Sequence, residues 1–160
     1  MTVAYLSLGA NLGNARQTLK DAVMYLTQQE PIMTLVESSL YRTAPVNADG
    51  NDFYNCVVKI NTTLAIRQLL TLCHSTENYF GRKRLYQNAP RTLDIDILLY
   101  GTIQIDWLDL KVPHPRLIER AFALVPLLEL EAEIEIPNLA RADYYLPNVS
   151  SQRIAKITPY

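Results

Sequence analysis

The order of hydrophobic patterns along the chain is the feature that most constrains its fold. Strand-like runs alternate with two segments of helical periodicity, in the order strand, helix, strand, strand, helix, strand. The expected strands cover residues 2–9, 33–42, 53–62 and 92–100, and the expected helices cover about 15–29 and 63–80. This order predicts an α+β fold with a ferredoxin-like βαββαβ core, whose antiparallel sheet carries its helices on one face. The opposite face would then be free to hold a site.

The last third of the chain adds a hairpin and a helix to this core. TIQI followed by WLDLKV predicts the hairpin, and HPRLIERAFALVPLLEL predicts a helical turn and a helix, with irregular structure after it. No repeat or shift in composition marks a boundary. Residues 1–160 are therefore expected to form a single domain, with no room for a second catalytic domain.

Composition and charge exclude several classes of protein. With 49% hydrophobic and 19% charged residues the chain should be globular, and its net charge of −1 gives no bulk attraction to nucleic acid or anionic membranes. There is no signal-peptide pattern, and no apolar run approaches the roughly 20 residues of a membrane span. Cys56 and Cys73 lack CxxC spacing and are expected to be reduced and buried. We expect a cytoplasmic monomer.

Two aspartates interrupt the otherwise apolar strand predicted in PRTLDIDILLYG. Residues i and i+2 of a strand point to the same side, so Asp94 and Asp96 should face one way together. The alternate residues would face the core: Leu93, Ile95, Ile97 and Leu99. Paired carboxylates repel unless they are solvated, share a proton or hold a cation, and Mg²⁺ is a cation that prefers oxygen ligands. A solvated outer face is the alternative, because D-x-D alone is a weak motif.

A basic loop precedes this strand. Four cations lie within ten residues that contain no acid: Arg82, Lys83, Arg84 and Arg91. Guanidinium groups beside paired carboxylates suggest a polyphosphate with its metal, since arginine binds phosphate oxygens bidentately. GxxxxGK[ST] and GxGxxG are both absent, so metal and side chains would have to hold the phosphates. Taken alone, GRKR also fits a solvated loop or a nucleic-acid patch.

Further candidate residues lie on a strand, on a helix and after the hairpin. Alternation in FYNCVVKINT puts Phe53, Asn55 and Val57 on one face, opposite the core face, where they offer an aromatic plane and an amide. His74 and Glu77 continue the inner face of the second helix toward its end. HPRLIERAF adds four more: His114, Arg116, Arg120 and Phe122. The two arginines would suit a phosphate, although a histidine beside proline is more often structural and a phenylalanine here more often belongs to a core.

Together these motifs resemble a known family. SLGANLGN, SSLYRTAPV, FYNCVV, APRTLDIDILLYG and HPRLIERAFALVPL, in this order, are similar to the 6-hydroxymethyl-7,8-dihydropterin pyrophosphokinases of folate biosynthesis, over nearly the whole chain. The resemblance implies transfer of the β,γ-pyrophosphoryl group of ATP to the hydroxymethyl group of the pterin, leaving AMP. It also implies two Mg²⁺ ions touched by Asp94 and Asp96, with Arg82 and Arg91 stabilising charge as the bond to AMP lengthens.

The same resemblance divides the remaining site residues between the two substrates. Aromatic rings, an amide and backbone groups would hold the pterin: Thr43, Val46, Phe53, Asn55 and Phe122. The ATP side would comprise His74, Glu77, Arg82, Arg84, Arg91, His114, Arg116 and Arg120. Loops 43–52 and 82–91 are the expected lids, because the site must exclude water before transfer.

The chain departs from the family pattern in both loops. Asn88-Ala89 stands where many members have Trp-Gly, and Gly50-Asn51 stands where many have Gln-Pro before the pterin-binding aromatic residue. These departures concern loop closure and pterin affinity, not the reaction class. Two alternatives remain open: a ferredoxin-like nucleic-acid-binding module, and another Mg²⁺-dependent nucleotidyl- or phosphotransferase.

Overall fold

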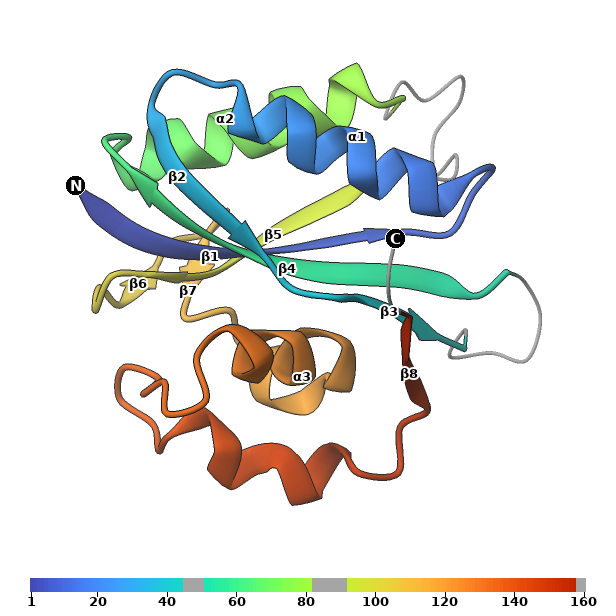
Figure 1. Ribbon diagram of the computed structural model, residues 1–160. Helices are drawn as coiled ribbons and strands as arrows, with labels where there is room; N and C mark the ends of the chain where they lie inside the picture. The colour runs from blue at the N-terminus through green and yellow to red at the C-terminus, as the bar shows by residue number, and fades with distance from the viewer. Residues whose placement is uncertain (45–50, 82–91, 158–160) are drawn as a thin grey trace.

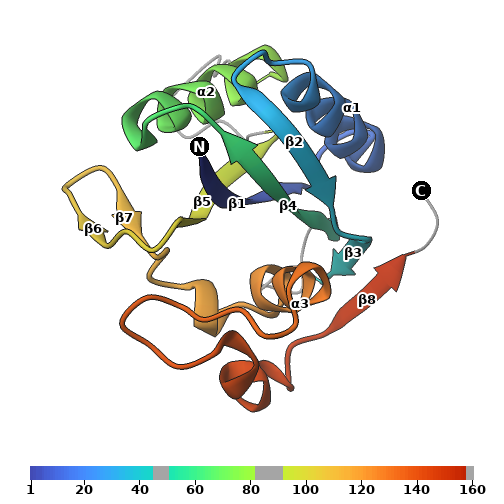
Figure 2. The same ribbon diagram turned by 60° about the vertical axis from the view of Figure 1, so that its left-hand side comes forward.

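A six-stranded antiparallel sheet forms the middle of the molecule. The structure, a computed structural model, describes residues 1–44, 51–81 and 92–157. The strands follow the order β5-β1-β4-β3-β8, and β2 also pairs with β4 (Figures 1 and 2). Their bounds are Thr2–Ala10 for β1, Ile32–Glu37 for β2, Leu40–Thr43 for β3, Phe53–Thr62 for β4, Asp94–Tyr100 for β5 and Ile154–Ile157 for β8. The predicted α+β class and antiparallel sheet are confirmed.

Two helices cover one face of the sheet, α1 (Ala15–Thr27) and α2 (Ile66–Tyr79) (Figure 1). The Asn14 side chain accepts a hydrogen bond from the Gln17 N–H at 3.3 Å and so caps the start of α1. After α2, Gly81 adopts a φ of +97°, which favours glycine. The first core lies between these helices and the sheet, and its fully buried leucines include Leu6, Leu8, Leu19, Leu26 and Leu69.

The opposite face is partly covered, which corrects the prediction that it is free. Helix α3 (Ala121–Leu130) lies against it, and the 3₁₀ segments η1 (Leu117–Glu119) and η2 (Ala142–Val149) pack on α3 (Figure 1). Val57 is fully buried there, in a second core, so that core residues alternate onto both faces of β4. Asp94, at the start of β5, remains exposed. The second face is therefore divided into a covered part and an uncovered part.

The strand predicted at 33–42 is two strands, because the chain breaks at Ser38. This buried residue donates its N–H to the Val57 carbonyl at 2.9 Å, and its Oγ accepts from the Val57 N–H at 2.9 Å. A side chain thus replaces a backbone partner between β2 and β3, and both strands still pair with β4. Alternation of apolar residues does not reveal this kind of break.

A register shift in β5 makes the prediction for Leu99 wrong. Pairing with β1 steps from Ile97 directly to Leu99, so Leu98 is an extra residue, a β-bulge. Such a bulge reverses the two faces beyond it. Leu98 and Leu99 both enter the second core, and Tyr100 returns to the first. The residues before the bulge face the first core as predicted: Leu93, Ile95 and Ile97.

The last third of the chain contains one strand that the sequence does not predict. The expected hairpin is present as β6 (Ile105–Asp106) and β7 (Lys111–Val112), and the expected turn and helix are η1 and α3. The tail, predicted to be irregular, forms η2 and then β8, which places Ile154 opposite Thr43 of β3. Cys56 and Cys73 are both buried, as predicted. Among the helices described, none has both the length and the apolar character needed to cross a membrane.

Candidate functional site

A row of residues crosses the sheet where three strands meet. Gly9 of β1 lies opposite Asp94 of β5 on one side and opposite Asn55 of β4 on the other. Directly opposite residues of antiparallel strands point to the same face. The carboxylate and the amide therefore face the same way, with a residue that has no side chain between them. Ser7 lies opposite Asp96 in the same manner, so the two aspartates share a face as the sequence predicts.

The two aspartates lie on an edge strand and are accessible. Asp94 is exposed, and 45% of the Asp96 side chain is exposed. Within the described residues, no group of three or more His, Cys, Asp or Glu side chains is arranged to hold a metal ion. Mg²⁺ commonly binds to one or two carboxylates and completes its shell with substrate phosphates and water. The pair therefore fits a Mg²⁺ ion that arrives with a polyphosphate better than a metal cage built by the protein alone.

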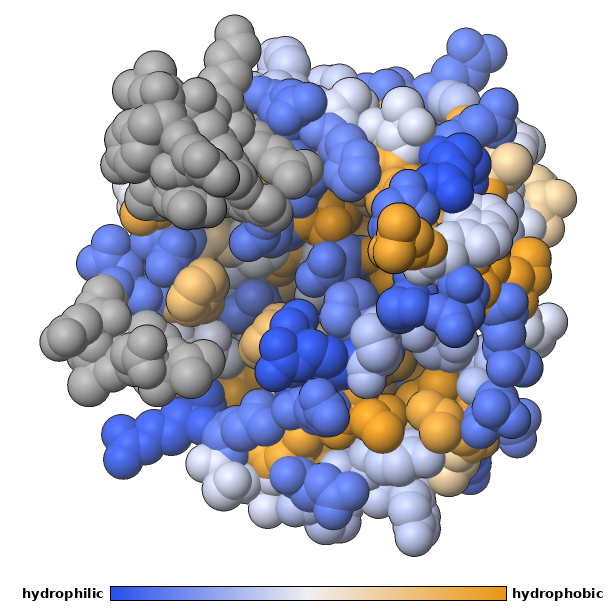
Figure 3. Space-filling model, turned by 180° about the vertical axis from the view of Figure 1, so that it is seen from behind, coloured by the Kyte–Doolittle hydropathy of each residue, from blue (hydrophilic) through white to orange (hydrophobic). Residues whose placement is uncertain are grey.

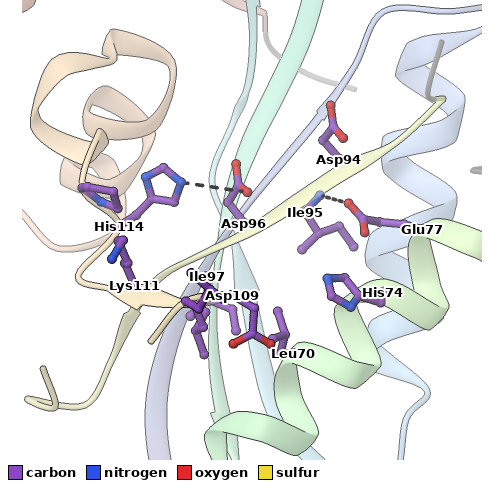
Figure 4. Close-up of a pocket in the computed structure, with 13 residues that line it drawn as sticks. Leu70, His74, Glu77, Asp94, Ile95, Asp96, Ile97, Asp109, Lys111 and His114 are labelled. Carbon is purple, nitrogen blue, oxygen red and sulfur yellow. Dashed lines mark hydrogen bonds and ion pairs between the residues drawn. The ribbon is translucent and has the colours of Figure 1, made fainter. Parts of the chain in front are cut away.

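Two basic side chains converge on Asp96. His114 Nε2 lies 4.0 Å from its Oδ1 (Figure 4), and Arg120 Nη1 lies 3.9 Å from its Oδ2. His114 Nδ1 accepts a hydrogen bond from the Arg116 N–H at 3.1 Å, so the neutral ring carries its proton on Nε2, toward Asp96. Burial lowers the pKa of His114, which favours this neutral form. The Arg120 guanidinium also lies over the Phe122 ring, 5.4 Å from its centre.

Glu77 fixes the strand between the two aspartates. Its carboxylate is buried, and Oε2 accepts a hydrogen bond from the Ile95 N–H at 2.9 Å (Figure 4). Because β5 is the edge of the sheet, this N–H has no neighbouring strand on its outer side. Glu77 therefore supplies the partner that a further strand would otherwise give. The sequence places Glu77 on the ATP side, and the structure adds this contact.

A cleft of about 340 Å³ opens beside these groups. Its walls come from α2, from β5 and from the β6–β7 hairpin, with Leu70, Asp96 and Asp109 as examples from each. His74, exposed on α2, faces the same cleft (Figure 4). Seen from behind, the molecule is hollowed near its centre, and hydrophilic residues surround much of the hollow (Figure 3). The described members of the predicted ATP group, apart from Arg116 and Arg120, thus line one cavity.

Three residues of the predicted pterin group, Thr43, Phe53 and Asn55, lie together at the opposite end of the row. Asn55 is buried, and its Nδ2 donates to Thr43 Oγ1 at 3.2 Å. A Cβ atom added to Gly9 would lie 2.8 Å from Asn55 Oδ1, so this glycine leaves room for the amide. Phe53, opposite Thr43 in the register, and Phe122 are both partly buried. A fixed amide and accessible aromatic surface can recognise a planar heterocycle.

Other predicted residues are not joined to this cluster. Arg116 is exposed and lies 3.5 Å from Glu119, so its side chain is directed toward an acid of its own turn. Four predicted site residues lie outside the described ranges: Val46, Arg82, Arg84 and Arg91. The predicted lids and the departures at Gly50 and at Asn88-Ala89 also lie wholly or largely outside them.

Two features of the site are not predicted from the sequence. Asp109 and Lys111 line the cleft from the hairpin, whose presence the sequence indicates but whose packing position it does not. Gly9 is the other, and SLGANLG offers a signal only in hindsight: a glycine inside a strand often marks a close approach of another group. Both depend on contacts between segments distant in sequence.

The chain is similar in sequence to a defined set of enzymes. The family model described as 7,8-dihydro-6-hydroxymethylpterin-pyrophosphokinase (HPPK) matches residues 5–132. A 2-amino-4-hydroxy-6-hydroxymethyldihydropteridine pyrophosphokinase of Bacillus subtilis is 41% identical over 134 residues, which cover 83% of this chain and 80% of that protein. The protein of the same name from Haemophilus influenzae is 34% identical over 160 residues, covering 99% of this chain and 100% of that one.

Solved structures agree on the fold. A crystal structure of an HPPK-DHPS protein in complex with substrates matches 94% of this chain with a TM-score of 0.73 and 14% identity. Wild-type HPPK-DHPS of Plasmodium falciparum with pteroate matches 100% of it with a TM-score of 0.72. This chain spans 44% and 48% of those longer chains. With the family match over most of its length, the chain belongs to the 7,8-dihydro-6-hydroxymethylpterin-pyrophosphokinase family.

Proposed function

We infer that the cleft beside Asp94 and Asp96 is where this chain performs the reaction of its family. That reaction transfers pyrophosphate from ATP to the hydroxymethyl group of 6-hydroxymethyl-7,8-dihydropterin, in folate biosynthesis. The row of Asp94, Gly9 and Asn55 across the sheet is the observation that carries the assignment. It puts carboxylates suited to a metal–phosphate complex beside an amide suited to a heterocycle, which is the arrangement a transfer between ATP and a pterin needs.

We propose that Asp94 and Asp96 hold two Mg²⁺ ions together with the phosphates of ATP. Both carboxylates are accessible from one face, which supports this role. The metal, when bound, would neutralise phosphate charge and lower the pKa of the attacking hydroxyl. Asp96 lies 4.0 Å from His114 Nε2 and 3.9 Å from Arg120 Nη1, so both groups would flank a metal–phosphate complex bound there.

The phosphates would be stabilised by side chains, because the chain has no phosphate loop. Arg120 lies within reach of anything bound at Asp96, and His114 presents an N–H there. We assign the same role to the basic residues predicted from the sequence: Arg82, Arg84, Arg91 and Arg116. Arg82 and Arg91 would act in the transition state, when negative charge grows on the leaving AMP.

The pterin would lie against the Asn55 end of the row. Asn55, held by Thr43, would hydrogen-bond the polar edge of the ring, and Phe53 and Phe122 would stack on its two faces. Backbone groups of Thr43 and Val46 would complete its recognition. The hydroxymethyl group would then point along Gly9 toward Asp94 and Asp96.

The chemical step is an in-line displacement on the β-phosphorus of ATP. The pterin hydroxyl oxygen forms a bond to this phosphorus while the bond to the oxygen shared with the α-phosphate breaks, so AMP leaves with that oxygen. Asp96 is the candidate to accept the hydroxyl proton. His74 and Glu77 would line the nucleotide side of the cleft.

We also propose that residues 1–160 work as one domain and as a monomer without nucleic acid. Exposed carboxylates on the site face support the last point, since they would repel a phosphate backbone. Cytoplasmic location stays a prediction from the sequence.

The test follows the nucleotide product. The chain is incubated with ATP, 6-hydroxymethyl-7,8-dihydropterin and Mg²⁺, and we expect AMP and the pterin diphosphate. ADP would indicate an ordinary kinase, and absence of any nucleotide product would indicate a binding protein; either result overturns the assignment. Asp94→Asn and Asp96→Asn should each abolish Mg²⁺-dependent turnover. Asp21→Asn on α1, where Asp21 accepts a hydrogen bond from Gln17, is the matched control and should leave turnover unchanged.

A further inference from the structure

The Gln152 side chain contacts the backbone on both sides of Arg120. Its Oε1 accepts a hydrogen bond from the Ala121 N–H at 2.8 Å, and its Nε2 donates to the Glu119 carbonyl at 2.8 Å. One amide therefore uses both its acceptor and its donor on the two neighbours of a single residue. Those neighbours lie more than 30 positions away in the sequence.

Arg120 occupies a junction that needs such support. It separates η1 from α3 and has an extended backbone, with φ −123° and ψ 113°. Its own side chain makes no capping hydrogen bond to the start of α3. The first N–H groups of a helix lack partners within the helix, and Gln152 supplies one for Ala121. The side chain of a distant residue thus acts as the cap of α3.

The direction of the Arg120 side chain follows from this junction. From here the guanidinium reaches Asp96, at 3.9 Å, and lies over Phe122, at 5.4 Å from the ring centre. A long side chain magnifies any rotation of the backbone that carries it. Loss of the contacts at Glu119 and Ala121 would therefore move the cation relative to the carboxylate.

Gln152 is itself fixed at both ends of its segment. On one side, Val149 is buried in the second core and accepts a hydrogen bond from the Gln152 N–H at 3.0 Å. On the other side, Ile154 begins β8 and lies opposite Thr43, the partner of the Asn55 amide. Residues 149–157 thus connect the Thr43 side of the site with the Arg120 side (Figure 2). They follow the part of the chain that matches the family model, residues 5–132.

We propose that Gln152 is a positioning residue that orients Arg120 toward Asp96 and the phosphates bound there. The inference rests on the proposed function, and it assigns a role in the reaction to the C-terminal segment. Gln152 would not touch a substrate; it would act through Arg120 alone.

The test is a double-mutant cycle in the pyrophosphokinase assay. Gln152→Leu removes both hydrogen bonds at similar size, and we expect a loss of roughly 10- to 100-fold in kcat/KM for ATP, the range for a misplaced catalytic group. Arg120→Ala should lose at least as much. In the double variant the losses should not multiply, so Arg120→Ala with Gln152→Leu should equal Arg120→Ala within about twofold. Losses that multiply would overturn the proposal.

Two further variants separate positioning from stability. Gln152→Glu keeps an acceptor for the Ala121 N–H and should lose less activity than Gln152→Leu. Gln29→Leu removes a hydrogen bond of 3.0 Å that Gln29, just after α1, donates to the Tyr25 carbonyl, and it should leave kcat/KM unchanged. Full activity in folded Gln152→Leu also overturns the proposal. Failure of the unaltered chain to form AMP would instead overturn the proposed function.

Discussion

The two faces of the sheet are built differently. The first lies under α1 and α2 and is packed with buried apolar residues over its whole core. The second is divided: α3, with η2 packed on it, covers one part with a second apolar core, and the other part carries Asp94, Asp96 and Asn55. Burial of apolar surface is the main source of stability, so the covered areas hold the fold. The polar candidate residues thus lie on the part of the sheet that α3 leaves uncovered.

The largest expected effects come from two matched leucines, Leu19 of α1 and Leu124 of α3, both fully buried. Leu19→Ala and Leu124→Ala should each lower the free energy of unfolding by about 2–5 kcal/mol, through lost transfer energy and a residual cavity. Only Leu124→Ala should also raise KM, because α3 follows Arg120 and carries Phe122. Denaturant titrations and steady-state kinetics on folded protein give both values. Equal changes in KM for Leu19→Ala and Leu124→Ala would contradict the stated difference between the two faces of the sheet.

Glu77 tests the boundary between the faces, since it extends from α2 to the edge of β5. Glu77→Leu leaves the Ile95 N–H without this partner, and we expect a loss of about 1–3 kcal/mol in unfolding free energy together with a lower kcat. Glu77→Gln keeps an acceptor oxygen, so its unfolding free energy and its kcat should both be close to those of the unaltered chain. If Glu77→Gln is as inactive as Glu77→Leu, the carboxylate charge matters rather than the strand position.

Gly9→Ala sharpens the comparison within the uncovered part. The added methyl group would meet Asn55 Oδ1 at 2.8 Å, so the amide must shift. We expect KM for the pterin to rise about tenfold, near 1.4 kcal/mol of binding energy, with KM for ATP unchanged. Gly13→Ala is the control: its φ of +59° predicts lower stability, but no atom of the described residues lies within 4 Å of the new methyl group. A rise in KM for ATP alone would contradict the placement of Asn55.

The smallest effect concerns Glu129, which ties α3 to β3. Tyr41 Oη donates to its Oε1 at 2.5 Å, and the Ser39 N–H donates to its Oε2 at 2.8 Å. Partial burial raises the pKa of Glu129, but these hydrogen bonds outweigh it and the net pKa is lowered. We expect Glu129→Gln to lose about 1 kcal/mol at neutral pH, a modest value because the group is exposed.

The pH dependence of Glu129 has a definite sign. A carboxyl whose folded pKa is lowered contributes stability above its ordinary pKa, near 4.5, and loses that contribution as the pH falls through and below this value. The difference in unfolding free energy between the unaltered chain and Glu129→Gln should therefore shrink from pH 7 to pH 4. The exposed control is Glu133→Gln, which removes a carboxylate that lies 3.8 Å from Arg141. Its difference in unfolding free energy from the unaltered chain should change little between pH 7 and pH 4. A constant difference for Glu129→Gln would refute the assigned hydrogen bonds.

Local sequence pattern predicts most helices and strands of this fold, but it does not predict which segments pack on each face of the sheet. The strand of Phe53–Thr62, the helix after Asn14 and the shared face of Asp94 and Asp96 all follow from periodicity, which is a property of neighbouring residues. The break at Ser38 and the pairing of β8 with β3 depend on partners distant in sequence. For the same reason the sequence does not predict the close approach of Gly9 to Asn55 or the contacts of Gln152 with the backbone around Arg120.

The bulge at Leu98 has a consequence for insertions and deletions. Before it, even-numbered residues of β5 face the site; after it, the parity is inverted, and Tyr100 turns back to donate its hydroxyl to the Leu64 carbonyl. The β6–β7 hairpin follows directly and forms an outer wall of the cleft. Removal of one residue here would therefore leave the aspartates on their face of the sheet. The side chains of β5 after the deletion would change faces, and the β6–β7 hairpin that follows would change its direction.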